Sequence, residues 1–282
     1  MDMAEKSAKT ARVQAVKNQN KCSNFGCYAI NGKEAYGVKT KDDQQVSTIY
    51  YFPDFQKPYT KTYKVGKGYL GHGNGMCCAE KYMFFTCWVR KAEAGKQQKY
   101  LRRVKYGKLT DNLTNSIKIM VPEATSGITF YKKSHLIIKQ SSVDGYLTFR
   151  MGKIVINEDG KAGNFETVWT IHVKNTTGFS TGQDIYYDTK TDCLFLPFCD
   201  LANCNNKIMV VNLSGAYEMH KGNKLYTPQD TIVINKKGKY TKYEVESVAI
   251  TADREMLMAV NIKKLGADRE DDAVEKISNI KF

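Results

Sequence analysis

The feature that most constrains the fold is a pair of short apolar strands, joined by a turn, that occurs five times along the 282 residues. Each pair begins with polar residues and is rich in Val, Ile, Tyr, Phe and Thr, which favour strands over helices. The five pairs span residues 24–38, 72–88, 124–138, 181–196 and 244–260. Equivalent positions lie 48, 52, 57 and 63 residues apart and are occupied by Gly26, Asn74, Ser126, Gln183 and Glu246.

A third strand follows each pair after a polar loop, and a fourth follows in most units. Third strands are predicted over 47–52, 100–106, 145–151, 207–213 and 273–280, and fourth strands over 60–65, 116–121, 168–173 and 231–234. A period of about 40–60 residues with three or four strands per unit is typical of propeller blades. The sequence therefore predicts an all-β fold, a five-bladed β-propeller, with a sandwich or barrel as the alternative.

The units account for residues 21–282 as a single propeller domain, with no remainder large enough for a second one. Residues 1–20 place small apolar residues among Lys and Gln, which predicts an N-terminal arm that is a short helix or disordered. Because the fifth unit ends at Phe282, we expect the first blade to borrow a strand from the chain terminus. Such closure removes exposed sheet edges.

The N-terminal segment lacks the apolar core of a secretory signal, and no run approaches the roughly 18–20 apolar residues of a membrane helix. We therefore expect no membrane span. The protein is expected to stay in the cytoplasm or to leave the cell by a non-classical route, unless its sequence is already processed.

The charge balance favours anionic partners. Forty-three basic and 29 acidic residues give a net charge of +14. Such a charge suits nucleic acid, anionic cell-wall polymers or acidic lipid surfaces, and the alternative is a surface of solvated lysines. No RNA-binding strand motif is present, so a nucleic-acid role is the weaker interpretation because it rests on charge alone. We expect a monomer.

The eight cysteines do not form a metal-binding pattern. Three lie in apolar strands, and Cys193, Cys199 and Cys204 are separated by five and four residues, unlike a Cys-x-x-Cys knuckle. They are interpreted as thiols in a reducing compartment, with a disulfide among the last three as the alternative. No metal or cofactor is indicated.

In a ring of five blades the first residues of the innermost strands converge around one mouth of the central channel. They would bring together eight polar residues: Asn24, His72, Asn74, Ser126, Thr181, Gln183, Glu244 and Glu246. Such a set suits a sugar, a small polar ligand or a hard cation. The alternative is that these side chains bond to one another and to water, and so fill the axis. The alternating glycines of residues 71–75 are expected where backbones crowd the axis.

Signatures of common enzyme classes are absent: the chain has no Gly-x-Ser-x-Gly, phosphate-binding loop or His-Glu-x-x-His. His72 and Glu246 could act as an acid and base pair. Glu244 and Glu246, however, project to the same face of one strand, whereas a glycosidase needs carboxylates that flank the substrate. Catalytic residues stay unassigned. Trp88 and Trp169 are expected to pack between neighbouring blades.

The stretch Tyr-Leu-Gly-His-Gly-Asn-Gly-Met at residues 69–76 resembles the Gly-His-Ala-Asn-Asp-Met strand start of helveticin J-like proteins. Residues 25–38 look like that family's first repeat, and 181–183 and 243–247 are similar to its later Gln-Gly and Glu-x-Glu-Gly motifs. Gly73 and Gly75 replace the Ala and Asp, so any ligand role of that acid is lost. The resemblance covers residues 22–262 as short motifs. It implies a bacteriocin-like, five-bladed β-propeller of Gram-positive bacteria with a secreted or cell-envelope role.

Three hypotheses of function follow. The first is a non-enzymatic propeller that binds a glycan or polyanionic cell-envelope ligand, bacteriocin-like by resemblance. The second is a glycan-active hydrolase or lyase that uses His72, Glu244 and Glu246 at the axis. The third is a protein-interaction scaffold that uses loops on one face.

Overall fold

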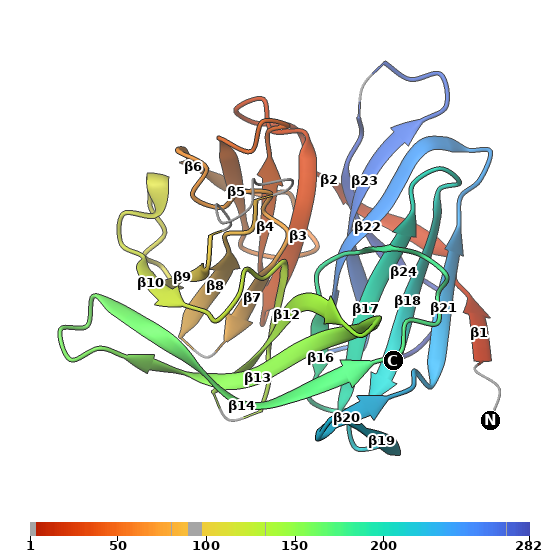
Figure 1. Cartoon of the computed structure of the whole chain (residues 1–282). Coiled ribbons are helices and arrows are strands. Elements are labelled where there is room, and N and C mark those ends of the chain that lie inside the picture. Colours follow the sequence, from red (N-terminus) through yellow and green to blue (C-terminus); the bar gives the residue numbers. More distant parts are fainter. Residues whose placement is uncertain (1–3, 80, 90–97, 133, 269) are drawn as a thin grey trace.

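The computed structural model describes residues 4–79, 81–89, 98–132, 134–268 and 270–282, and the regular secondary structure of this part of the chain is almost entirely strand (Figure 1). Its helical structure is one 3-10 turn, η1 (Asp111–Leu113). The all-β prediction is confirmed. No helix among the described residues is long and apolar enough to cross a membrane.

The strands form successive antiparallel runs that follow the predicted units. The first run is β3 (Asn24–Asn31), β4 (Glu34–Thr40), β5 (Ser47–Phe52) and β6 (Lys61–Val65). The second is β7 (Met76–Ala79), β8 (Tyr82–Thr86), β9 (Tyr100–Lys105) and β10 (Ile117–Met120). The third is β11 (Gly127–Phe130), β12 (His135–Val143), β13 (Tyr146–Ile156) and β14 (Ala162–Val173).

The later runs are less regular. In the fourth, β15 (Thr181–Gly182) and β16 (Tyr186–Asp188) both pair with β17 (Cys193–Asp200), followed by β18 (Asn205–Asn212) and β21 (Asp230–Asn235). The hairpin of β19 (Tyr217–His220) and β20 (Asn223–Tyr226) leaves this run and pairs with β14. The last run is β22 (Tyr240–Ile250), β23 (Met256–Lys264) and β24 (Ala273–Ile277).

The first strands of the runs form a closed ring. β3 lies against β22 and β7, β11 lies against β7 and β16, and β16 lies against β22. Apolar side chains fill the space between neighbouring runs. Phe25 of β3 shares a buried cluster with Leu257 of β23, and Phe149 of β13 shares another with Leu196 of β17. The core is therefore a set of layers between sheets arranged around an axis.

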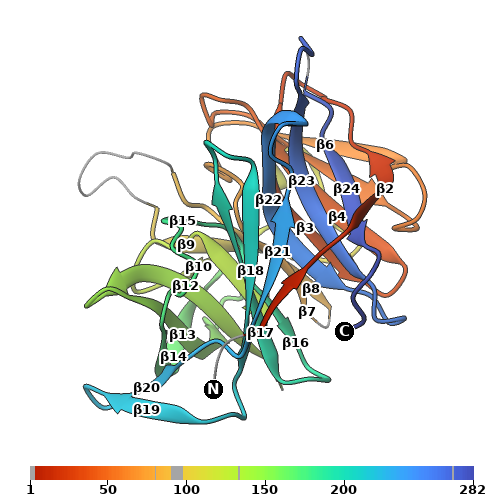
Figure 2. The same cartoon turned by 90° about the vertical axis from the view of Figure 1, so that its right-hand side faces the viewer.

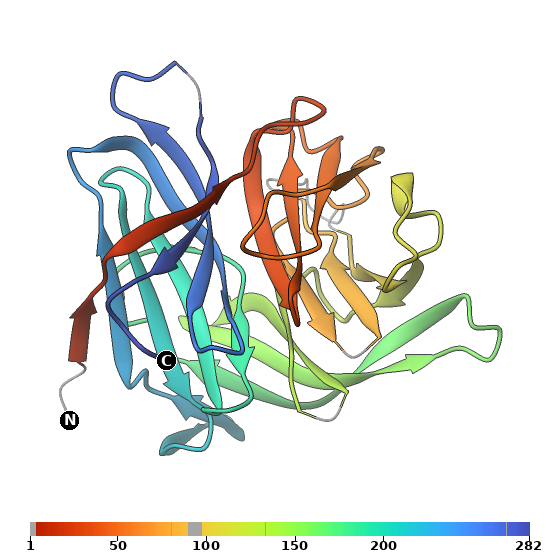
Figure 3. The ribbon, with the colours of Figure 1, turned by 180° about the vertical axis from the view of Figure 1, so that it is seen from behind.

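The prediction for the N-terminal segment is wrong. It forms two strands, β1 (Ala4–Ser7), which pairs with β21, and β2 (Thr10–Ala15), which pairs with β24 (Figures 2 and 3). A helix is not formed because both partner strands offer an open edge whose backbone groups need hydrogen bonds. Closure also runs opposite to our expectation, since the first run is complete and the last run takes a strand from the N-terminus.

A buried ion pair fastens this closure. Lys39 Nζ of β4 lies 2.8 Å from the Asp272 carboxylate just before β24, and both side chains are inaccessible to solvent. The same ammonium donates to the Val16 carbonyl at 3.0 Å and to the Asn18 side chain. Burial lowers the pKa of Lys39 and raises that of Asp272. One cation thus connects the first run, the last run and the segment after β2.

We predict that Lys39→Met destabilises the protein by about 3–5 kcal/mol, because it leaves the buried Asp272 carboxylate without its cation. The double variant Lys39→Met/Asp272→Asn should recover part of this loss, because the buried charge is then removed. Urea unfolding measures both. As a control, Lys153→Met breaks an exposed pair with Glu166 and should cost less than about 1 kcal/mol. A double variant no more stable than the single one would contradict the role of the pair.

Candidate ligand-binding site at the axis

Seven of the eight predicted polar residues line one cavity of about 180 Å³ at one end of the ring of inner strands. Asn24 comes from β3, Glu244 and Glu246 from β22, and the others from the segments that begin β7 and β15–β16. The seven are Asn24, His72, Asn74, Thr181, Gln183, Glu244 and Glu246. Ser126 is partly exposed and does not line the cavity.

The sequence did not indicate several other lining residues. Trp88 follows the second strand of its pair, Lys242 precedes the predicted strand start, and Asn261 lies on β23. Leu201 also reaches the cavity from the end of β17. Trp88, which we expected to pack between blades, lines the cavity, and its ring centroid lies 5.9 Å from that of His72. Lys242 could have been predicted as a lining residue, because it lies two residues before Glu244 and alternate residues of a strand point to the same face.

The two glutamates lie side by side and share one amide. Asn261 Nδ2 donates to Glu246 Oε1 at 2.8 Å and to Glu244 Oε2 at 3.3 Å, while its oxygen accepts from the Phe25 N–H at 2.6 Å. Burial, and next the adjacent Glu244, raise the pKa of Glu246 well above its usual range. Lys242 Nζ lies 3.6 Å from Glu244. The same ammonium lies 3.1 Å from Glu270, so the positive charge of Lys242 is shared between Glu244 and an acid outside the cavity lining.

Asn74 lines the cavity and carries a buried acceptor that no described residue uses. Its residue is only 7% exposed, and its side-chain oxygen accepts no hydrogen bond from the described residues. A buried polar atom without a partner costs about 1–3 kcal/mol. A hydroxyl or amide donor in the cavity would remove this cost.

Close backbone packing sets the position of His72. The His72 N–H donates to the Trp88 carbonyl at 2.7 Å, and the two rings meet edge to face at 5.9 Å. Gly71, with φ of 55°, lies so near that a Cβ there would stand 2.0 Å from the same carbonyl oxygen. At Gly26 a Cβ would stand 2.3 Å from the Gly73 carbonyl oxygen. The expectation of glycine at crowded backbone positions is confirmed at these two residues.

Asp184 lies on the axis and joins the inner strands. Its carboxylate accepts from the N–H groups of Ile185 at 2.8 Å, Ile128 at 3.0 Å and Met76 at 3.1 Å. Its own N–H donates to the Glu246 carbonyl at 3.0 Å. Burial raises the pKa of Asp184 to about 8, although the three N–H groups oppose that shift.

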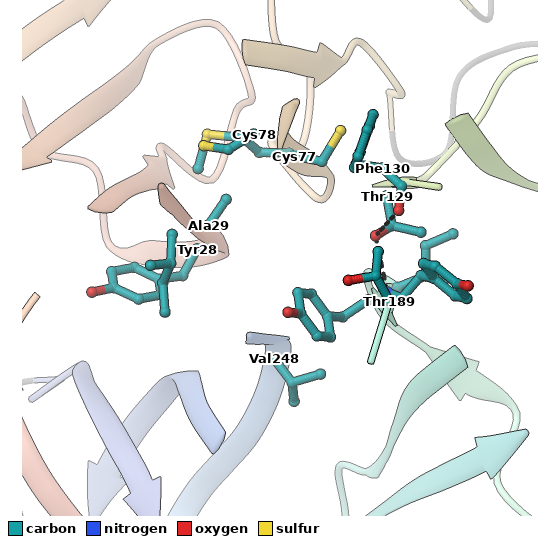
Figure 4. Close-up of a pocket in the computed structure, with 13 residues that line it drawn as sticks. Tyr28, Ala29, Cys77, Cys78, Thr129, Phe130, Thr189 and Val248 are labelled. Carbon is teal, nitrogen blue, oxygen red and sulfur yellow. Dashed lines mark hydrogen bonds between the residues drawn. The ribbon is translucent and has the colours of Figure 1, made fainter. Parts of the chain in front are cut away.

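The opposite end of the ring holds a second cavity, of about 230 Å³, which is lined by the far ends of the same strands (Figure 4). Its side chains are less polar and include Cys77, Phe130 and Val248. Burial raises the pKa of the Cys77 thiol well above its usual value, so this cysteine is a poor nucleophile. All eight cysteines lie in the described residues and are free. The described part of the chain gathers no group of three or more His, Cys, Asp or Glu that could hold a metal ion.

No protein-family model and no curated protein matches the sequence. Among solved structures, the chain is similar to a xylan β-1,4-xylosidase from Bacillus halodurans C-125, with 11% identity, a TM-score of 0.55 and 92% of the chain covered. The chain spans about half of that protein, 54%. It is also similar to an α-L-arabinofuranosidase from Lactobacillus brevis, with 9% identity, a TM-score of 0.53 and 90% of each chain covered. These likenesses show an all-β fold of the propeller type.

We predict that Asp184→Asn changes how stability depends on pH. The folded protein keeps the Asp184 proton up to about pH 8, whereas an unfolded Asp releases it near about pH 4. The free energy of unfolding therefore falls as pH rises between these values, by at most about 1.4 kcal/mol per pH unit for one group. Asn does not titrate in this range. The free energy of unfolding of the variant should therefore lack the part of the pH dependence that Asp184 contributes.

Urea unfolding of both proteins at several pH values across that range measures the effect. The variant should also be less stable at the low end, because its amide cannot accept the Met76 N–H in place of the carboxylate oxygen. Glu246→Gln is the comparison variant, because it removes another buried acid with a raised pKa. Parallel pH curves for Asp184→Asn and the unmodified protein would contradict the prediction.

Proposed function

We propose that this protein is a five-bladed β-propeller that binds a neutral, hydroxyl-rich ligand, a glycan, in the axial cavity and does not turn it over. The five antiparallel runs and the closed ring of their first strands support the blade number. The resemblance to helveticin J-like proteins suggests a glycan of the bacterial cell envelope. The propeller-type neighbours include proteins named as a xylosidase and an arabinofuranosidase, which makes a sugar ligand a reasonable choice.

The single observation that carries this proposal is the buried side-chain oxygen of Asn74, a residue of the polar cavity lining, which no described residue bonds. Sugar hydroxyls both donate and accept, so they suit an acceptor at Asn74 together with the amides of Asn24 and Gln183. The Trp88 ring supplies the apolar surface that a sugar face requires. A volume of about 180 Å³ is below the roughly 300 Å³ of typical small-molecule sites. We therefore infer that one sugar residue, such as a chain end, occupies it.

A neutral ligand fits the cavity better than an anionic one. Two glutamates and one lysine line it, so a phosphate or carboxylate would meet the Glu244 charge at close range. The net charge of +14 is spread over the rest of the chain. Binding of a polyanion, if it occurs, belongs to the outer surface.

We predict that the protein binds neutral oligosaccharides, tested with xylose-, arabinose- and N-acetylglucosamine-terminated chains by calorimetry. Asn74→Leu should weaken binding by about 5- to 150-fold, the equivalent of losing one buried hydrogen bond. Asn115→Leu, at an exposed position outside the cavity, is the matched control. Raising salt from about 50 to 200 mM should change the affinity little, whereas a polyanion would be released. Absence of binding to every chain, or binding that Asn74→Leu leaves intact, would refute the proposal.

The second candidate is a glycan-active hydrolase or lyase, favoured by the names of the two neighbours and by His72 in the same cavity. The shared amide of Glu244 and Glu246 opposes it, because the two acids lie together instead of on either side of a bond. If this candidate is correct, His72→Ala should lower the release of reducing sugar by about 10²- to 10⁴-fold. His220→Gln, outside the cavity, should leave it unchanged. No turnover of a broad glycan panel by the unmodified protein would exclude the candidate.

A further inference from the structure

The outer edge of β14 is only partly paired. β13 occupies one edge of this strand along most of its length. On the other edge β10 pairs with residues 162–164 and β20 pairs with residues 171–173, both in parallel orientation. Between them, no strand of the described residues pairs with residues 165–170 on that edge. Six residues of strand span about 20 Å, so the gap is long enough for a peptide segment.

Exposed apolar side chains gather around this gap. Among the described residues, six of the nine large apolar side chains that are exposed lie on β14, on β10 or β13 beside it, or on β19 of the β19–β20 hairpin. The six are Met120, Val155, Val168, Trp169, Tyr217 and Met219. Trp169 is 40% exposed, so the expectation that it packs between blades is wrong. A concentration of apolar surface at an open strand edge marks an interaction site.

A groove of about 640 Å³ adjoins the same edge. It lies between β14 and the β19–β20 hairpin, which projects from the rim of the molecule (Figures 1 and 2). Trp169 meets Tyr131 edge to face at 6.2 Å on one side, and Tyr217 carries the Lys224 ammonium over its ring at 4.3 Å on the other. Side chains of a segment lying along β14 would enter this groove.

We propose that an extended segment of a partner protein binds here as an added strand, with its backbone on residues 165–170 and its apolar side chains in the groove. Backbone hydrogen bonds supply affinity in such complexes, and the pockets for alternate side chains supply specificity. Exposed lysines stand at both ends of the gap, Lys118 and Lys161 near β10 and Lys224 near β20. The one acid within it, Glu166, is paired with Lys153 at 3.6 Å. The partner segment is therefore apolar in the middle and acidic at its ends.

A free segment fits better than a second copy of this chain. The open edge is recessed between β10 and β20, and the β14 of another copy is flanked in the same way, so two such edges meet poorly. β14 itself carries a β-bulge at Val168, which lies between the pairs Met151–Trp169 and Gly152–Thr167 and bends this edge. Bulges of this kind hinder the flat pairing of identical edges.

A displayed library of seven-residue peptides, with Asp and Glu at the ends and five variable residues between, tests the proposal. Peptides selected on the unmodified protein should bind Val168→Lys and Met219→Lys at least about tenfold more weakly in fluorescence anisotropy. Leu265→Lys changes another exposed apolar residue, remote from this edge, and should bind within about twofold of the unmodified protein. Methylation of alternate backbone nitrogens of the peptide should abolish binding, because the added strand loses its donors.

Hydrogen exchange gives a second measurement. The bound peptide should slow exchange of amides within residues 165–170, as an added strand requires. Three outcomes would overturn the proposal: a library that yields no binder, binders that tolerate both lysine substitutions, and self-association of the unmodified protein that Val168→Lys abolishes. The last of these would assign the edge to a second copy.

Discussion

The hydrogen bonds around Asp184 are the interaction on which the ring of strands depends. The innermost strand of each sheet has a neighbour on one side and the axis on the other, so its backbone groups at the axis lack a partner strand. One carboxyl group provides acceptors for the N–H groups of Met76 on β7, Ile128 on β11 and Ile185 just before β16. Loss of these bonds would leave three buried donors, at about 1–3 kcal/mol each. Burying the Asp184 side chain costs less than leaving these donors unpaired. Its raised pKa favours the protonated form, which carries no charge.

Closure of the ring depends on a second buried charge, the ammonium group of Lys39. Lys39 binds the Asp272 carboxylate and the backbone after β2, so it holds residues from both ends of the chain against the first sheet. Burial alone does not select this register, because apolar strands can slide by two residues without exposing their apolar face. A single cation with fixed partners allows one register. We infer that the pair serves specificity of closure more than stability, as many buried ion pairs do.

Much of the fold could be predicted because strand pairs separated by turns leave a strong local signal. β3–β4, β7–β8 and β22–β23 were all visible in the alternation of apolar runs and turn residues. The cavity could be predicted for the same reason, since the polar first residues of inner strands must converge when the strands form a ring. β1 and β2 could not, because their weak pattern becomes a strand only through the open edges of β21 and β24. Asn261 and Trp88 were not predicted as lining residues because neither lies at the start of an inner strand. Only the folded structure brings them to the cavity.

The role of Asp184 shows most clearly what could not be predicted from the sequence. In the repeat it occupies the position that Gly75, Gly127 and Ser247 occupy elsewhere, and the sequence alone suggests only that it caps a turn. Its partners lie 108 and 56 residues away, so no local pattern contains them. The small residues at the equivalent positions leave room for the Asp184 side chain. A Cβ at Gly127 would stand 3.3 Å from the Asp184 oxygen, so the carboxyl group would have to shift by a few tenths of an ångström. Gly75 and Gly127 have no side chain at this position, and Asp184 fills the space near the axis with the one acid among the equivalent residues.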